Sequence, residues 1–190
     1  EATLCIRDYG NGLTEEAVFA VYTQYGASTK RDSNEAVGML GIGAKSAFAY
    51  SDAFTVTSWC DGKKTIYVAV LDETNIGAMS KEWEEPSDEP TGVEIKVPVD
   101  PKDVEEFWQE ATQLYTWFDV RPVLNMSLAY PQFQEHFRSE AGVIFFKAPN
   151  DAMYGGWLAK MGCVAYRLNW ERVASRPDFE PYKELIEKMQ

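Results

Sequence analysis

The alternation of apolar and polar positions along the chain predicts helices interspersed with hairpin-connected strands. Residues 2–7, ATLCIR, form a short apolar run that predicts a buried strand, and a glycine-rich turn follows at 8–12. Residues 13–26 predict a helix that begins after the N-cap Thr14 and ends at Gly26. Four apolar residues share one face of this helix: Val18, Val21, Tyr22 and Tyr25.

Two β-rich runs, residues 52–60 and 63–71, flank Asp61 and Gly62 and predict a hairpin. The acidic, proline-containing stretch 82–92 is expected to be a loop, and 93–99 a further strand. Before the hairpin, the polar stretch 27–37 predicts a loop, and residues 44–50 predict a short helix after a run of glycines.

A long helix is predicted over residues 101–118, with Asp100 as its cap and Pro101 in its first turn. Its apolar residues recur at helical spacing and are expected to be core: Val104, Phe107, Trp108, Ala111, Leu114, Tyr115 and Phe118. Further on, 142–148 and 157–169 predict strands and 179–190 a terminal helix. This layout favours an α+β fold, a two-layer α/β sandwich with helices on one face of a mostly antiparallel sheet.

Composition narrows the function classes. The net charge of −12 and pI near 4.6 exclude a basic nucleic-acid surface and disfavour anionic membranes. No apolar run approaches the roughly 20 residues of a membrane span. The three cysteines, Cys5, Cys60 and Cys163, form no C-x-x-C pair and are expected to be reduced and buried in a cytoplasmic protein. The single histidine, His136, has no metal-ligating neighbours in sequence and is expected at the surface.

Candidate chemistry lies in three glycine-rich segments. They are Asp8-Tyr9-Gly10-Asn11-Gly12, then Gly38-x-x-Gly41-x-Gly43, then Thr91-Gly92 before a strand. The second segment is one position away from a P-loop, because Ala44 stands where that motif needs lysine and Lys45 follows it. Taken singly, each segment is also compatible with an ordinary turn, helix entrance or loop end.

Taken together, the three segments resemble the GHKL nucleotide-binding family, which includes DNA gyrase B, MutL, sensor histidine kinases and ninety-kilodalton heat-shock chaperones. That family carries D-x-G-x-G after a strand, then a helix, a lid, a glycine loop opening a helix, and later a Gly/Thr pair. The stretches RDYGNGL, YGASTKRDS, GMLGIGAKSAFAY and FDVRP most resemble the rIIA-like bacteriophage proteins. The specific part of the resemblance covers residues 1–100 and implies the GHKL (Bergerat) type of sandwich.

The resemblance implies an ATP site. Asp8 matches the aspartate that accepts a hydrogen bond from the adenine amino group, although an aspartate here can also simply fix its own turn. Gly10 and Gly12 leave room for base and ribose. Thr91 matches the threonine that helps to hold the aspartate and its water, but the order here is Pro-Thr-Gly where the family more often has Gly-Thr.

The phosphates are expected at the glycine loop, where backbone N–H groups can approach their oxygens closely. Lys45 either neutralises phosphate or is a solvated helix lysine, and Lys30, beside Arg31, is a lid lysine with the same two interpretations. The expected phosphate-contacting residues are Lys30, Gly38, Gly41, Gly43, Ala44 and Lys45.

The family also uses an earlier helix with E-x-x-x-N, whose Glu is the general base and whose Asn holds Mg²⁺. No such helix precedes Glu1, so we expect a fragment that lacks it, in which Mg²⁺ binding needs that segment and the catalytic residues stay unassigned. Residues 101–190 are expected to complete the domain or to begin a transducer-like second one. Lys160 is a weak candidate there for a lysine that reaches the γ-phosphate.

Two functions remain open. In the first, ATP orders the lid and changes a homodimer or partner interface, as in an ATPase-driven conformational switch. In the second, a catalytically inactive protein keeps the fold and binds a host or phage protein, for which the 14% aromatic content is suitable. A redox or sugar dinucleotide enzyme is disfavoured, because the glycines run G-x-x-G-x-G and no βαβ strand precedes them.

Overall fold

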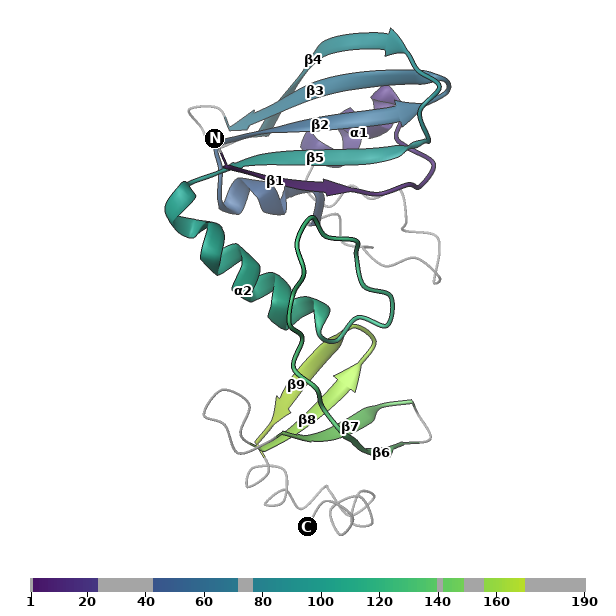
Figure 1. Cartoon of the computed structure of the whole chain (residues 1–190). Helices are drawn as coiled ribbons and strands as arrows, with labels where there is room; N and C mark the ends of the chain where they lie inside the picture. Colours follow the sequence, from purple (N-terminus) through teal and green to yellow (C-terminus); the bar gives the residue numbers. More distant parts are fainter. Residues whose placement is uncertain (1, 24–42, 72–76, 140–141, 149–155, 170–190) are drawn as a thin grey trace. The chain divides into compact units, whose positions relative to one another are not determined.

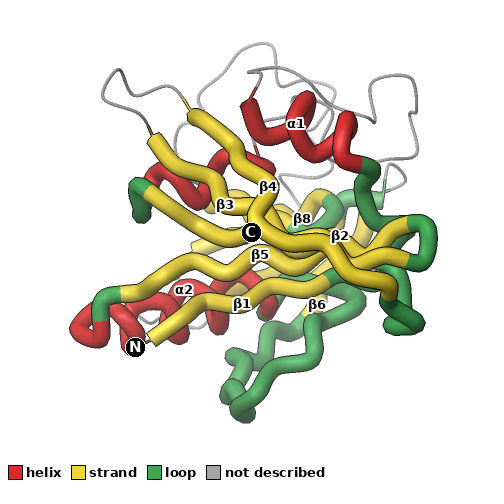
Figure 2. Tube along the Cα trace, turned by 90° about the horizontal axis from the view of Figure 1, so that it is seen from above, coloured by secondary structure: helices red, strands yellow, loops and turns green. Residues whose placement is uncertain are grey.

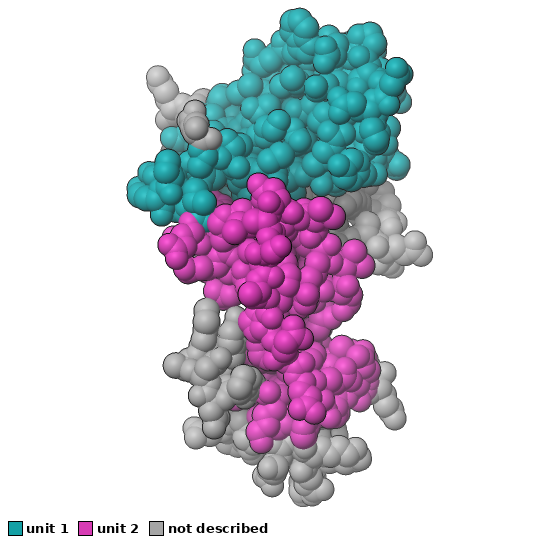
Figure 3. Space-filling view, in the orientation of Figure 1, with its two compact units in different colours: residues 1–104 teal, residues 105–190 magenta. Residues whose placement is uncertain are grey.

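The computed structural model describes residues 2–23, 43–71, 77–139, 142–148 and 156–169. The chain divides into two compact units, residues 1–104 and 105–190 (Figure 3). Each unit has its own antiparallel sheet and its own apolar cluster. The predicted α+β class with mostly antiparallel strands is confirmed within the described residues.

The first unit is built on a five-stranded sheet with the order β1-β5-β2-β3-β4 (Figure 1). Every neighbouring pair is antiparallel. The predicted hairpin at Asp61 and Gly62 is present, and both residues have positive φ, as its tight turn requires. The strands are β1 (Ala2–Arg7), β2 (Ala53–Cys60), β3 (Lys63–Leu71), β4 (Gly77–Pro86) and β5 (Gly92–Val99).

Two helical elements cover one face of this sheet: α1 (Glu15–Thr23) and the 3-10 helix η1 (Gly43–Ala49) (Figure 2). The hydroxyl of Thr14 accepts a hydrogen bond from the Ala17 amide, which confirms the predicted N-cap. Val18 and Tyr22 of α1 are buried, and Phe48 of η1 packs edge-on against Phe54 at 4.7 Å between ring centroids. The buried core comprises Val18, Tyr22, Phe54, Val56, Tyr67, Ala69 and Val97.

The prediction of a loop over residues 82–92 is wrong in its first half, because β4 continues to Pro86. This strand is the sheet edge, where polar and charged side chains reach solvent while the backbone pairs with β3. Lys63 and Lys64 of β3 form ion pairs with Glu84 and Glu85 of β4, at 2.9 and 3.7 Å. Charge pairs across the strands therefore accompany backbone pairing in a segment whose composition resembles a loop.

Burial was overpredicted at three places. β1 lies at the other edge of the sheet, and its Cys5 and Ile6 are exposed. Cys60 is half-buried and Cys163 is exposed, so the cysteines are free, as predicted, but not buried. An apolar run does not distinguish an edge strand from a central one, because that position depends on which strands pair.

The second unit contains most of the long helix and a four-stranded sheet with the order β6-β7-β8-β9. The predicted helix 101–118 is a 3-10 turn, η2 (Pro101–Asp103), followed by α2 (Val104–Tyr115), and Asp100 caps it by accepting from the Lys102 amide. No residue of α2 is buried, so its apolar face is not the predicted core. The strands are β6 (Glu135–Arg138), β7 (Ile144–Ala148), β8 (Gly156–Met161) and β9 (Val164–Leu168).

The core of the second unit is instead made by Phe145, Trp157 and Ala159 on β7 and β8. The strands predicted within 142–148 and 157–169 are confirmed. His136 is exposed, as expected, and its ring lies 4.8 Å from that of Trp157. The predicted residues Tyr25 and Gly26 and the helix 179–190 lie outside the described residues.

Replacing Val18 tests the packing of α1 on the sheet. Val18→Ala removes two fully buried methyl groups, so we expect the free energy of unfolding to fall by about 2 kcal/mol. Chemical denaturation measures this, with Val123→Ala, at a fully exposed position, as the control expected within 0.5 kcal/mol of wild type. Equal losses from both variants would contradict the assigned core.

Candidate functional site

The D-x-G-x-G turn follows β1 directly and is held by hydrogen bonds at both ends. The Asp8 amide donates to the Val93 carbonyl of β5 at 2.9 Å. One carboxylate oxygen of Asp8, Oδ1, accepts from the Gly10 amide at 2.8 Å. This second bond is the turn-fixing role that an aspartate often has, and it orients the carboxylate. Among the described residues, no hydrogen bond to the other oxygen, Oδ2, is found.

Ser58 and Gly12 attach the far end of the turn to β2. The buried Ser58 hydroxyl donates to the Leu13 carbonyl at 2.7 Å and accepts from the Leu13 amide at 2.8 Å. Gly12 has φ +74°, and a Cβ there would lie 2.1 Å from the Trp59 carbonyl oxygen. Only glycine permits both that dihedral angle and that approach, so the turn rests directly on the β2 backbone.

Thr91 and Gly92 connect the start of β5 to the turn at Asp8 and Gly10. The Thr91 hydroxyl donates to the Gly10 carbonyl at 2.8 Å, across 81 residues of sequence. A Cβ on Gly92, whose φ is +147°, would lie 2.0 Å from the Asp8 carbonyl oxygen. The Thr-Gly pair and the aspartate turn, which sequence links only by resemblance, therefore form one structural unit.

The carboxylate of Asp8 is exposed and acts electrostatically on α1. Burial, and to a smaller extent the negative charge of Asp8, together raise the pKa of the Tyr22 hydroxyl to about 12. An exposed carboxylate with one oxygen held in the turn is suited to accept a hydrogen bond from a ligand N–H group.

The structure brings together four of the ten predicted binding residues: Asp8, Gly10, Gly12 and Thr91. Gly43, Ala44 and Lys45 begin η1, which confirms the predicted short helix as a 3-10 helix, but their side chains are not described. Lys30, Gly38 and Gly41 lie outside the described residues, as do Arg31 and most of the lid.

Within the described ranges, no group of three or more His, Cys, Asp or Glu side chains gathers to hold a metal ion. No helix among the described residues is long and apolar enough to cross a membrane.

Lys160, the candidate for contact with a γ-phosphate, is engaged within the second unit. It is buried on β8, and its Nζ lies 2.5 Å from Oδ1 of the exposed Asp119. The Lys160 ammonium lowers the pKa of the Asp119 carboxyl below its ordinary value. The ion pair with Asp119 explains how a buried lysine is tolerated at this position.

Sequence reasoning missed Ser58, Trp59 and Arg7, which all contact the turn or its neighbours. Ser58 is a polar residue in an alternating apolar strand, at a position that points to the core. A buried hydroxyl needs a hydrogen-bond partner, and this requirement could have identified Ser58 from the sequence as a residue that holds another segment. The partner itself, the Leu13 backbone, is visible only in the folded chain.

The profile described as "Histidine kinase-, DNA gyrase B-, and HSP90-like ATPase" matches residues 1–102, more than half of the chain. The chain belongs to this GHKL-type family of ATPase domains. No curated protein is significantly similar to it.

The solved structures to which the chain is similar include ATPase regions of topoisomerase II. The ATPase region of Saccharomyces cerevisiae topoisomerase II matches at 16% identity, with a TM-score of 0.38, over 50% of this chain and 28% of that one. The ATPase and transducer domains of Balamuthia mandrillaris DNA topoisomerase II match at 17% identity, with a TM-score of 0.43, over 58% of this chain and 34% of that one. The chain thus spans about a third of the length of these proteins.

Gly92→Ala tests the close approach of β5 to the turn. The added Cβ would collide with the Asp8 carbonyl, and the φ at residue 92 is unfavourable for alanine. We therefore expect the free energy of unfolding to fall by about 3 kcal/mol. Gly62→Ala is the matched control, because its φ is also positive but nothing lies within 4 Å of the added Cβ. We expect it to lose about 1 kcal/mol. Denaturation curves showing equal losses would contradict the contact.

Lys160→Met tests the ion pair with Asp119. Since the folded pKa of Asp119 lies below its unfolded value, the pair stabilises the fold above the unfolded pKa, and this contribution is lost as pH falls through the folded pKa. In Lys160→Met, the Asp119 pKa should rise towards its ordinary value, measured by NMR titration of the carboxyl carbon. An unchanged Asp119 pKa would show that the pair does not form in solution.

Proposed function

We propose that the chain binds an adenine nucleotide, ATP, at the Asp8 turn, as part of a nucleotide-driven conformational switch. The observation that carries this proposal is the exposed Asp8 carboxylate, whose orientation is set by the Gly10 amide beside the Thr91 hydroxyl. The family membership of residues 1–102 supports the nucleotide as the ligand class.

The chemistry of the carboxylate favours adenine. With Oδ1 engaged by Gly10, the oxygen Oδ2 is the acceptor offered to a ligand, and an ionised carboxylate only accepts hydrogen bonds. The 6-position of adenine carries an amino donor, whereas that of guanine carries a carbonyl acceptor. The carboxylate therefore attracts the adenine edge and repels the guanine edge, which is a large discrimination because the wrong base leaves polar groups unpaired.

Thr91 completes the base-contacting part of the site in this proposal. Its hydroxyl is already oriented by donation to the Gly10 carbonyl, so its oxygen lone pairs remain available as acceptors for water or ligand. A Cβ on Gly10 would lie 3.1 Å from Oδ1 of Asp8, so its missing side chain leaves space beside the carboxylate, whereas Gly12 keeps the turn in contact with β2. The hydrogen bonds that hold Asp8 and Thr91 in place come from the protein itself, which reduces the entropy cost of binding.

The triphosphate belongs, in this proposal, to the glycine loop and the lid. Gly38, Gly41, Gly43 and Ala44 would offer backbone N–H groups, and Lys30 and Lys45 would supply positive charge. Magnesium would accompany the triphosphate, as is usual for this chemistry.

The alternative is a protein that keeps the fold and acts by binding a host or phage partner. Origin from an rIIA-like bacteriophage protein, a cytoplasmic location and homodimerisation or partner binding belong to the same proposal.

Asp8→Asn tests the base contact. The amide oxygen can still accept from Gly10, so the turn should persist, but the lost charge and the introduced N–H₂ donor oppose the adenine amino group. We expect ATP and ADP affinity to fall by about 100-fold, measured by titration calorimetry. Asp61→Asn, at the exposed hairpin turn, is the matched control and should bind as wild type does.

Guanine nucleotides provide the second comparison. Wild-type protein should bind GDP at least about 100-fold more weakly than ADP, because the site is built for a donor at the 6-position. Folded wild-type protein that binds neither nucleotide would overturn the proposal and favour the partner-binding alternative. Equal affinity of wild type and Asp8→Asn for ADP would remove Asp8 from the site.

A further inference from the structure

Arg7 immediately precedes Asp8 but lies on the opposite face of the sheet. On β1 it pairs with Glu94, which in turn pairs with Thr57 of β2. Alternation along β2 places Thr57 and Trp59 on the face away from Val56, which packs in the core under α1. The Arg7 side chain therefore lies on the face of the sheet opposite the α1-covered core.

An aromatic ring supports the guanidinium group of Arg7. Its Cζ lies 3.6 Å from the centroid of the buried Trp59 ring and 5.1 Å from that of Tyr9. The Arg7 side chain is only 18% exposed. The guanidinium group thus lies over the Trp59 ring at cation–π distance, which favours its position on this face of the sheet.

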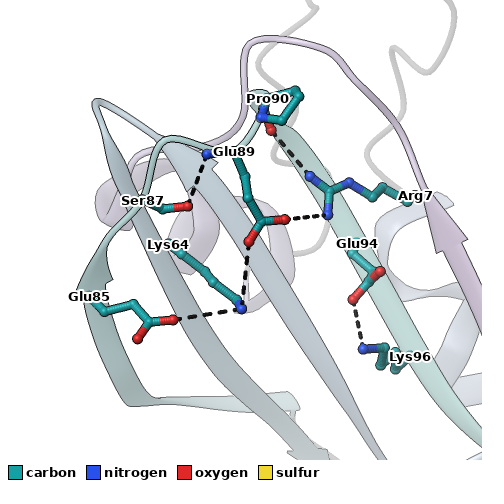
Figure 4. A network of polar contacts seen from close by, with 8 residues as sticks. All are labelled: Arg7, Lys64, Glu85, Ser87, Glu89, Pro90, Glu94 and Lys96. Carbon is teal, nitrogen blue, oxygen red and sulfur yellow. Dashed lines mark hydrogen bonds and ion pairs between the residues drawn. The ribbon is translucent and has the colours of Figure 1, made fainter.

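Those N–H groups reach the segment that carries Thr91 (Figure 4). The Arg7 Nη2 donates to the Pro90 carbonyl at 3.2 Å, and Nη1 lies 3.6 Å from Oε2 of Glu89. Glu89 is held from a second side by Lys64, at 3.9 Å, and its amide donates to the Ser87 hydroxyl at 3.2 Å. Residues 87–90 are therefore attached at several points to the face of the sheet that carries Arg7 and Lys64.

We propose that Arg7 is a positioning residue for the nucleotide base, acting through Thr91. Resting on the proposed function, this inference assigns Arg7 the task of holding Pro90 so that the next residue, Thr91, stays bonded to the Gly10 carbonyl. Asp8 and Thr91 then approach the ligand as one rigid group. The clamp consists of Arg7, Trp59, Glu89 and Pro90, and none of them contacts the ligand.

Arginine is specifically suited to this clamp. The stacking, the carbonyl contact and the carboxylate contact are made at once by different parts of one planar group. A lysine ammonium is a point charge without a plane, so it cannot stack flat while donating in two fixed directions. The Nε of Arg7 and Nε1 of Trp59 are buried without a partner among the described residues, a cost that the other contacts offset.

The test compares Arg7→Lys with Lys96→Gln. Lys96 lies on the same face and pairs with Glu94 at 2.8 Å, but it does not contact residues 87–91, which makes it the matched control. We expect Arg7→Lys to weaken ADP binding about tenfold and Lys96→Gln to leave it unchanged. Glu89→Gln, at a half-exposed position, should produce a smaller loss in the same direction and secures the test if Arg7→Lys folds poorly.

A double-mutant cycle separates positioning from a general structural role. Thr91→Val removes the hydroxyl at similar volume, so in that background Arg7→Lys should cause no further loss of ADP affinity. If the two losses add instead, Arg7 does not act through Thr91 and the inference is overturned.

Hydrogen exchange tests the clamp without any nucleotide. In Arg7→Lys, the amides of Asp8 and Gly10 should exchange about tenfold faster than in Lys96→Gln, because the turn is less constrained. Wild-type rates at both amides would overturn the inference even if ADP binds. If wild-type protein binds no nucleotide, but Arg7→Lys still exchanges faster at these amides, Arg7 holds the turn as inferred. Only the proposed nucleotide function is then overturned.

Discussion

The candidate site depends on the direct contact between the backbone of the Asp8 turn and the first residue of β5. The missing side chain at Gly92 allows the two backbones to approach so closely that a Cβ would lie 2.0 Å from the Asp8 carbonyl. The same principle holds at Gly12 against β2. Because backbones are much stiffer than side chains, these two contacts set the carboxylate and the Thr91 hydroxyl with little freedom to drift.

The two faces of the five-stranded sheet carry different kinds of contacts. Under α1 and η1, aromatic and β-branched residues make the core that stabilises the unit. On the other face lie the ion pairs of Arg7, Lys64 and Glu89 (Figure 4). The guanidinium group of Arg7 also lies over the Trp59 ring there. Arg7 on this face directly precedes Asp8, which carries the carboxylate of the candidate site.

The errors of sequence interpretation have a common cause. Apolar patterning identified β1 and α2 as elements but overestimated their burial, because burial depends on which neighbours pack against an element. The acidic end of β4 was taken for a loop, because edge strands tolerate charges that a central strand does not. The carboxylate turn, the hairpin and the helix caps were predicted correctly, since each depends on local residue chemistry that acts within a few positions.

By itself, the sequence determined the class of fold, the main turns and caps, and, through the order of its glycine segments, the family to which residues 1–102 belong. The fold class, turns and caps follow from local stereochemistry and periodicity, which neighbouring residues carry along the chain, whereas the family was identified by resemblance. Only the tertiary structure decided that Thr91 bonds to the Gly10 carbonyl, that Ser58 holds Leu13, and that Arg7 reaches Pro90. Those contacts join residues tens of positions apart, and strand pairing alone brings them within hydrogen-bonding distance.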